Sequence, residues 1–216
     1  MLPDHPLVLH GGCNCRAIRY KVQVPARSQR PLNPFSDGQV PFPMVTTDHC
    51  NDCRRATGSI LPTWICVPTS MMTCQLQPVS SSSSSSSTNQ DARRGDDAAA
   101  PPSSPWVPAV ELFKPGPDKD KYHVQFYQSS ADITRTFCGR CGTNLTYFMT
   151  HGMGEGYPEI FDTILGTLDR EDLEKDWMAP DRHCWWSCGI EWVQQLSNGG
   201  TVLPVHPTFK VNEFVE

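Results

Sequence analysis

Apolar and polar side chains alternate along several short segments of this chain, which is the pattern of half-buried β-strands. In residues 16–24, RAIRYKVQV, the side chains of Ile18, Tyr20, Val22 and Val24 fall on one face. Similar strand-like runs occur at residues 60–68, 109–114, 121–128, 132–149 and 158–169. We therefore expect a mostly β protein, built from small stacked antiparallel sheets with few short helices.

Two local arrangements can be predicted around these runs. Residues 109–114 and 121–128 flank the turn-rich spacer PGPDKD, so we expect them to pair as a hairpin. Residues 170–178, REDLEKDWM, form the best helix candidate, with Asp169 as its N-cap and acidic residues in its first turn.

Residues 79–108 break the alternating pattern. Eight consecutive serines precede a stretch of mixed charge, alanine and proline. Such a composition cannot bury enough apolar surface to offset the entropy lost on ordering. We predict one β domain formed by residues 1–78 and 109–216, interrupted by a disordered insertion at residues 79–108.

Charge and hydropathy exclude some classes of partner. The formal net charge of the 216 residues is −5, so no global field attracts the protein to nucleic acid, which we do not expect as a partner. No run approaches the roughly 20 apolar residues of a membrane span. The N-terminal residues lack the basic and apolar regions of a signal peptide. We therefore expect a cytoplasmic protein that does not associate with membranes.

Ten cysteines in a reducing compartment need a role other than disulfide formation, and we favour metal ligation. In FCGRCGT, residues 137–143, a C-x-x-C turn brings two thiolates to one point, and its glycines tolerate positive φ. In GGCNCRA, residues 11–17, a regular strand would direct both cysteines to the same face. The predicted structural zinc site therefore consists of Cys13, Cys15, Cys138 and Cys141.

The stretch TDHCNDCRRATGS, residues 47–59, contains a second group of possible ligands. Asp48, Cys50 and Cys53 would supply three ligands and leave a fourth tetrahedral position for water or substrate, as in catalytic zinc sites. Alternatively, Asp48 caps the following turn and the two thiols carry no metal; the spacing does not favour either reading. Arg54 and Arg55 are candidates for gripping a substrate carboxylate, although a salt-bridged or solvated role is common for such residues.

Five motifs together resemble one family. GGCNCRAIRY, HCNDCRRATGS, FCGRCGTNLTY, GTLD and APDRHCWWSCGIEW are similar in type and order to motifs of the glutathione-dependent formaldehyde-activating enzyme / centromere protein V family, between about residues 9 and 195. The resemblance implies an all-β zinc-binding fold, with the structural zinc on the four cysteines named above. It also implies a second, catalytic zinc on the C-x-C-x-x-C stretch, where the family's first cysteine falls on Asp48.

Two functions of different classes follow from these observations. The first is a zinc-dependent carbon–sulfur lyase-type enzyme that acts on an adduct of glutathione, or of another thiol, with an aldehyde or small metabolite. Its catalytic residues would be Asp48, Cys50 and Cys53, with glutathione as a cosubstrate. The alternative is a non-catalytic binding module stabilised by zinc. A homodimer formed through the tryptophan-rich C-terminal part is compatible with either function.

Overall fold

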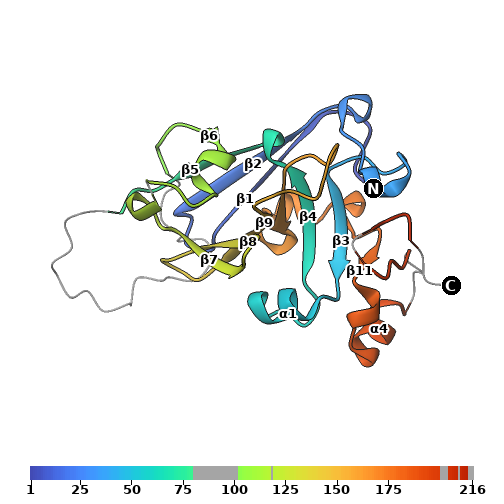
Figure 1. Cartoon of the computed structure of the whole chain (residues 1–216). Helices are drawn as coiled ribbons and strands as arrows, with labels where there is room; N and C mark the ends of the chain where they lie inside the picture. The colour runs from blue at the N-terminus through green and yellow to red at the C-terminus, as the bar shows by residue number, and fades with distance from the viewer. Residues whose placement is uncertain (80–101, 118, 200–203, 209, 214–216) are drawn as a thin grey trace.

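The computed structural model describes residues 1–79, 102–117, 119–199, 204–208 and 210–213 (Figure 1). These residues form two β-sheets. The four-stranded sheet is antiparallel and has the order β1 (Leu7–Gly12), β2 (Ile18–Val24), β5 (Met72–Leu76), β6 (Val107–Pro108). The seven-stranded sheet has the order β11 (His183–Cys184), β3 (Met44–Asp48), β4 (Thr63–Pro68), β10 (Ile160–Ile164), β9 (Asn144–Met149), β8 (Ile133–Cys138), β7 (Val124–Ser130).

Neighbouring strands of the larger sheet run antiparallel, except β11, which pairs parallel to β3. The α-helices in the described part of the chain are short: α1 (Asn51–Thr57), α2 (Ala109–Leu112), α3 (Arg170–Leu173) and α4 (Glu191–Ser197). The expectation of a mostly β protein with few short helices is confirmed.

The hydrophobic core lies between the two sheets, because both contribute side chains to one buried cluster. Tyr20 and Val22 of β2 are fully buried in it, as are Ile65 of β4 and Phe161 of β10. Side chains alternate between the two faces of a strand. The sequence neighbours of Ile65 and Phe161 therefore point to the face of the larger sheet that lies opposite the core. That second face carries the candidate site described below.

The predicted hairpin between residues 109–114 and 121–128 is wrong. Residues 109–112 form α2, which closes with a hydrogen bond from the Phe113 amide to the Ala109 carbonyl, 2.7 Å long. Both residues are fully buried, and their i, i+4 spacing places them on one face of the helix. The centres of the Phe113 and Phe161 rings lie 5.8 Å apart. The hairpin partner of β7 is β8.

The predicted helix over residues 170–178 is shorter than expected, since α3 ends at Leu173 and a 3₁₀ turn follows at Asp176–Met178. Asp169 does not cap it with its side chain. Its carboxylate instead forms a salt bridge with the Arg19 guanidinium at 2.5 Å. A charged partner on β2 therefore takes the side chain that the sequence assigned to a helix cap.

The predicted insertion at residues 79–108 extends too far at its C-terminal end. Residues 80–101 lie outside the described residues, whereas Val107–Pro108 form β6 against β5. The Ser104 hydroxyl donates to the Leu76 carbonyl oxygen at 3.0 Å, and the Lys21 ammonium lies 4.5 Å from the centre of the Trp106 ring. These contacts attach residues 104–108 to the smaller sheet.

The segment after α3 returns to the larger sheet. The His49 amide donates to the Cys184 carbonyl oxygen at 3.0 Å, and the His49 and His183 rings are hydrogen-bonded at 3.0 Å between Nε2 and Nδ1. In Figure 1, α4 lies below β11. None of the helices formed by the described residues has the length and apolar character that crossing a bilayer requires.

Candidate metal centres

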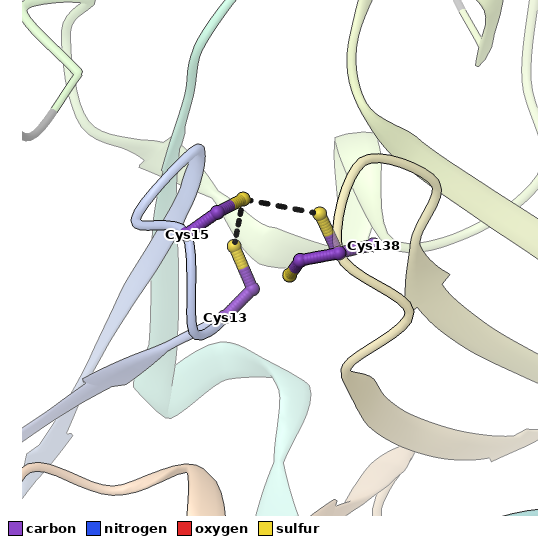
Figure 2. A group of neighbouring side chains, drawn as sticks. Cys13, Cys15 and Cys138 are labelled. Carbon is purple, nitrogen blue, oxygen red and sulfur yellow. Dashed lines mark hydrogen bonds between the residues drawn. The ribbon is translucent and has the colours of Figure 1, made fainter. Parts of the chain in front are cut away.

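Four cysteines from two distant hairpins meet in the structure (Figure 2). Cys13 and Cys15 lie in the turn between β1 and β2, and not in a regular strand as expected; Arg16 closes this turn with a φ of 59°. Cys138 ends β8 and Cys141 lies in the turn that leads to β9. The four sulfur atoms all lie within 4.8 Å of one another.

The distances between these sulfurs suit a metal ion. The Cys13 and Cys15 sulfurs are 3.5 Å apart, and those of Cys15 and Cys138 are 3.7 Å apart. Tetrahedral zinc with zinc–sulfur bonds of about 2.3 Å would place its sulfurs about 3.8 Å apart. A disulfide needs about 2.05 Å, and all ten cysteines are free thiols. The four-cysteine cluster could therefore hold a metal ion, and its all-sulfur donor set fits zinc.

Backbone geometry shapes the Cys138 turn. Gly142 has a φ of +75°, as expected for the knuckle, and its amide donates to the Cys138 carbonyl oxygen at 2.8 Å. Gly139 does not have positive φ. Glycine is needed there because a Cβ would lie 2.7 Å from the Gln125 side chain on the neighbouring strand.

The acidity of the four thiols reflects their crowding. Hydrogen bonding from the Cys13 thiol lowers the pKa of Cys138 to about 5. The same hydrogen bond, with burial and the nearby charge of Cys138, raises the pKa of Cys13. Burial raises the pKa of Cys15 to about 11. Without a cation, one sulfur of the group ionises easily and its neighbours then resist ionisation, which is the electrostatic situation that a divalent ion relieves.

The second group of donors lies where β3 runs into α1. Asp48 ends the strand, Cys50 occupies the N-cap position of the helix, and Cys53 lies in its first turn. Donor atoms of the three residues lie within 4.8 Å of one another. The Asp48 carboxylate also accepts hydrogen bonds from the Cys50 amide at 2.8 Å and the Trp64 indole at 3.0 Å. Asp48 therefore accepts a hydrogen bond from the start of the helix, as expected if it caps the turn. It also lies close enough to both sulfurs to share a metal ion with them, as expected if it is a ligand.

The environment separates the acidities of these donors. The hydrogen bond from Cys53, together with backbone amides at the helix start, lowers the pKa of Cys50 to about 6. The proton in that hydrogen bond stays on Cys53, whose pKa is raised by it and by burial. Burial also raises the pKa of the Asp48 carboxyl group.

A cavity of about 860 Å³ opens over these three residues. Its floor is the face of the larger sheet that points away from the core. Side chains on neighbouring strands lie there in one row across the strand direction, because they are paired in register. From β3 to β7, the row consists of Met44, Cys66, Asp162, Tyr147, Arg135 and Tyr127, all of which line the cavity.

The polar members of this row that were not among the candidates from the sequence include Arg135, Tyr147 and Asp162. Arg135 is 6% exposed, and its Nη2 lies 3.6 Å from the Cys53 sulfur. The Asp162 Oδ1 is enclosed without a hydrogen-bond partner, and burial raises the pKa of its carboxyl group to about 6. One signal was available: Arg135 and Asp162 are charged residues in the middle of otherwise strand-like runs.

The two arginines predicted to bind substrate are separated by the helix. Arg55 lines the cavity. Arg54 is not among the cavity-lining residues, and its Nη2 lies 3.5 Å from the Asn51 side-chain oxygen. The geometry therefore leaves Arg55 as a cavity residue and gives Arg54 a place on the helix surface.

Comparison with models of known protein families finds no match, and comparison with curated proteins finds none either.

Proposed function

We propose that this chain is a zinc-dependent enzyme that makes or breaks the carbon–sulfur bond of a thiol–aldehyde adduct, with glutathione as one possible thiol. The observation that carries the proposal is the position of Asp48, Cys50 and Cys53 at a large cavity. Three protein donors leave one tetrahedral position open to substrate, whereas four close a site. The four-cysteine group matches a structural zinc site, and the three-donor group matches a catalytic one.

The donor set fits zinc on chemical grounds. Thiolate and carboxylate are both zinc ligands, and the Asp48 carboxylate is oriented by the Trp64 indole and the Cys50 amide. Each carboxylate oxygen keeps a further lone pair for a metal ion. Zinc bound there would supply Lewis acidity toward a thiolate sulfur or a carbonyl oxygen.

The residues of the cavity floor can handle the proton of the reaction. When an adduct R–S–CH(OH)–R′ is cleaved, the hydroxyl proton leaves as the carbonyl forms, and the C–S electron pair departs with the sulfur. In the proposal, the Asp162 carboxylate accepts that proton, because a carboxyl group with a pKa of about 6 exchanges protons near neutral pH. The proton then returns to the thiolate to give the free thiol. Arg135 lies beside the Cys53 sulfur and favours negative charge there.

The alternative of a non-catalytic module is favoured by one observation: both Asp48 oxygens already accept hydrogen bonds. Magnetisation-exchange NMR on glutathione mixed with formaldehyde separates the two functions, because it measures how fast the adduct forms and breaks. We expect zinc-loaded protein to accelerate this exchange, Cys53→Ser to return it to the uncatalysed rate, and Cys74→Ala, a buried thiol on β5 outside both clusters, to retain it. No acceleration by the wild type, or full activity in Cys53→Ser, would contradict the enzyme.

A further inference from the structure

Arg135 lies buried in the floor of the cavity. It projects from the middle of β8, paired in register with Tyr147 on β9 and Tyr127 on β7. Its guanidinium carbon lies 5.1 Å from the centre of the Tyr147 ring, which is a cation–π contact. The side chain is 6% exposed, so it is removed from bulk water but not from the cavity.

The hydrogen-bonding capacity of this guanidinium is largely unused. Within the described part of the chain it forms no salt bridge with a carboxylate, and its one hydrogen bond runs from Nη2 to the Cys53 sulfur. Nε is enclosed without a partner. Nη1 has no hydrogen-bond partner among the described residues either, yet it is not fully enclosed, so this is the amino group that can meet a ligand.

A second buried arginine shows what a structural role looks like in this fold. The Arg182 side chain is 7% exposed, and its Nε bonds the Asp181 carboxylate at 2.6 Å. Burying a guanidinium without a carboxylate is costly, because its desolvation is not offset by a charged partner. The five N–H donors of arginine match a carboxylate with two parallel hydrogen bonds. Arg135 thus lacks the direct ion pair that Arg182 has. Asp48 and Asp162 act on its charge without forming a salt bridge with it, and it lies at the cavity, where a ligand can provide one.

We propose that Arg135 binds a carboxylate of the ligand, and that the ligand is a small thiol that bears a carboxylate, or the aldehyde adduct of such a thiol. The pairing of these two groups follows from the 3.6 Å between Nη2 and the Cys53 sulfur, since a ligand sulfur at the Cys50–Cys53 donors would lie near the guanidinium. The inference rests on the proposed function only for the presence of that sulfur. It assigns the carboxylate to Arg135 rather than to Arg54 or Arg55.

Isothermal titration calorimetry on the zinc-loaded full chain tests this assignment with matched probes. Mercaptoacetate carries both a thiol and a carboxylate, whereas 2-mercaptoethanol carries a thiol and no charge. We expect mercaptoacetate to bind the wild type at least tenfold more tightly. Arg135→Gln should raise the Kd of mercaptoacetate about ten- to hundredfold, which is the range for a lost hydrogen bond to a charged group. It should leave the Kd of 2-mercaptoethanol within about threefold of the wild-type value.

Three further variants sharpen the result. Arg170→Gln makes the same charge change on the exposed helix α3 and should leave the mercaptoacetate Kd within twofold. Arg135→Lys keeps the charge but loses the planar fork, so its Kd should fall between those of the wild type and Arg135→Gln; it carries the test if the glutamine variant does not fold. Equal losses for both probes in Arg135→Gln, or a larger loss in Arg55→Gln than in Arg135→Gln, would overturn the assignment.

The proposed function and this assignment fail in different ways. If mercaptoacetate binding depends on Arg135 but no thiol–aldehyde adduct is turned over, the ligand assignment stands and the enzyme proposal fails. If adducts are turned over while Arg135→Gln binds mercaptoacetate as the wild type does, the assignment is wrong and the enzyme proposal stands. Zinc content measured on each variant shows that the metal is not the variable.

Discussion

Replacing Cys138 by alanine should destabilise the fold far more than replacing a comparable thiol outside the clusters. The four-cysteine cluster links the turn after β1 to the end of β8, and its Cys15 and Cys138 sulfurs belong to residues 123 positions apart. A cross-link that closes a loop of this length lowers the conformational entropy of the unfolded chain. In the loop-closure model this raises the free energy of the unfolded state by about 5 kcal/mol at 25 °C. A metal ion held by both hairpins acts on the unfolded chain in the same sense.

That magnitude is large beside the 5–15 kcal/mol that stabilises typical domains. At about 2–4 °C per kcal/mol for a chain of this size, loss of the cluster should lower Tm by about 10–20 °C. The control is Cys74→Ala, because Cys74 and Cys138 are both 0% exposed and lie on strands, so the loss of a buried sulfur is matched.

Differential scanning calorimetry of the zinc-loaded proteins measures the effect. We expect a strong chelator to lower the Tm of the wild type toward that of Cys138→Ala and to leave Cys138→Ala nearly unchanged. If Cys138→Ala and Cys74→Ala unfold within 2 °C of each other, and the chelator has no effect on the wild type, the cluster does not hold the hairpins together and the argument is refuted.

Three further predictions concern single positions. Burial raises the pKa of Asp162 from 3.8 to about 6, so its stabilising contribution is present below pH 4 and lost as pH rises through 6. Between pH 4 and 7.5, the free energy of unfolding of Asp162→Asn should therefore increase relative to that of the wild type by up to about 3 kcal/mol. Urea unfolding measures this difference, and a difference that does not change with pH would contradict the prediction. In metal-free protein, iodoacetamide should modify Cys50 with a midpoint near pH 6, because its hydrogen bond from Cys53 favours the thiolate; a midpoint near 9, measured by mass spectrometry, would be inconsistent with that environment. Gly11→Ala should lower Tm by several degrees, because its Cβ would overlap the Tyr20 ring, and an unchanged Tm would show that the ring can move aside.

The sequence predicted those parts of the fold that depend on local pattern. Alternation identified β2, β4, β8, β9 and β10, because one face of each strand is buried against the other sheet. It failed at residues 109–114, where a short apolar run is compatible with either a strand or one helical turn, and the burial of Ala109 and Phe113 decides for the helix.

The candidate site was predictable to the same limit. Cysteine spacing alone suggested which thiols share a metal. In the structure, the members of each predicted donor group lie close together. The positions of Arg135 and Asp162 in the cavity floor could not be predicted. That the two residues lie in one row depends on the register of β8, β9 and β10, which the hydrophobic pattern of a single strand does not specify. Cys184 and Cys188 have the i, i+4 spacing of one helix face, yet they lie in β11 and in a 3₁₀ turn, and Cys188 is exposed.

The central claim is that Asp48, Cys50 and Cys53 hold a second metal ion at the cavity. Native mass spectrometry of the zinc-loaded chain counts bound ions directly. We expect two zinc ions per wild-type chain, one in Asp48→Ala and one in Cys53→Ser, with the second ion retained in Cys74→Ala. One zinc ion in the wild type, unchanged by Asp48→Ala, would contradict it.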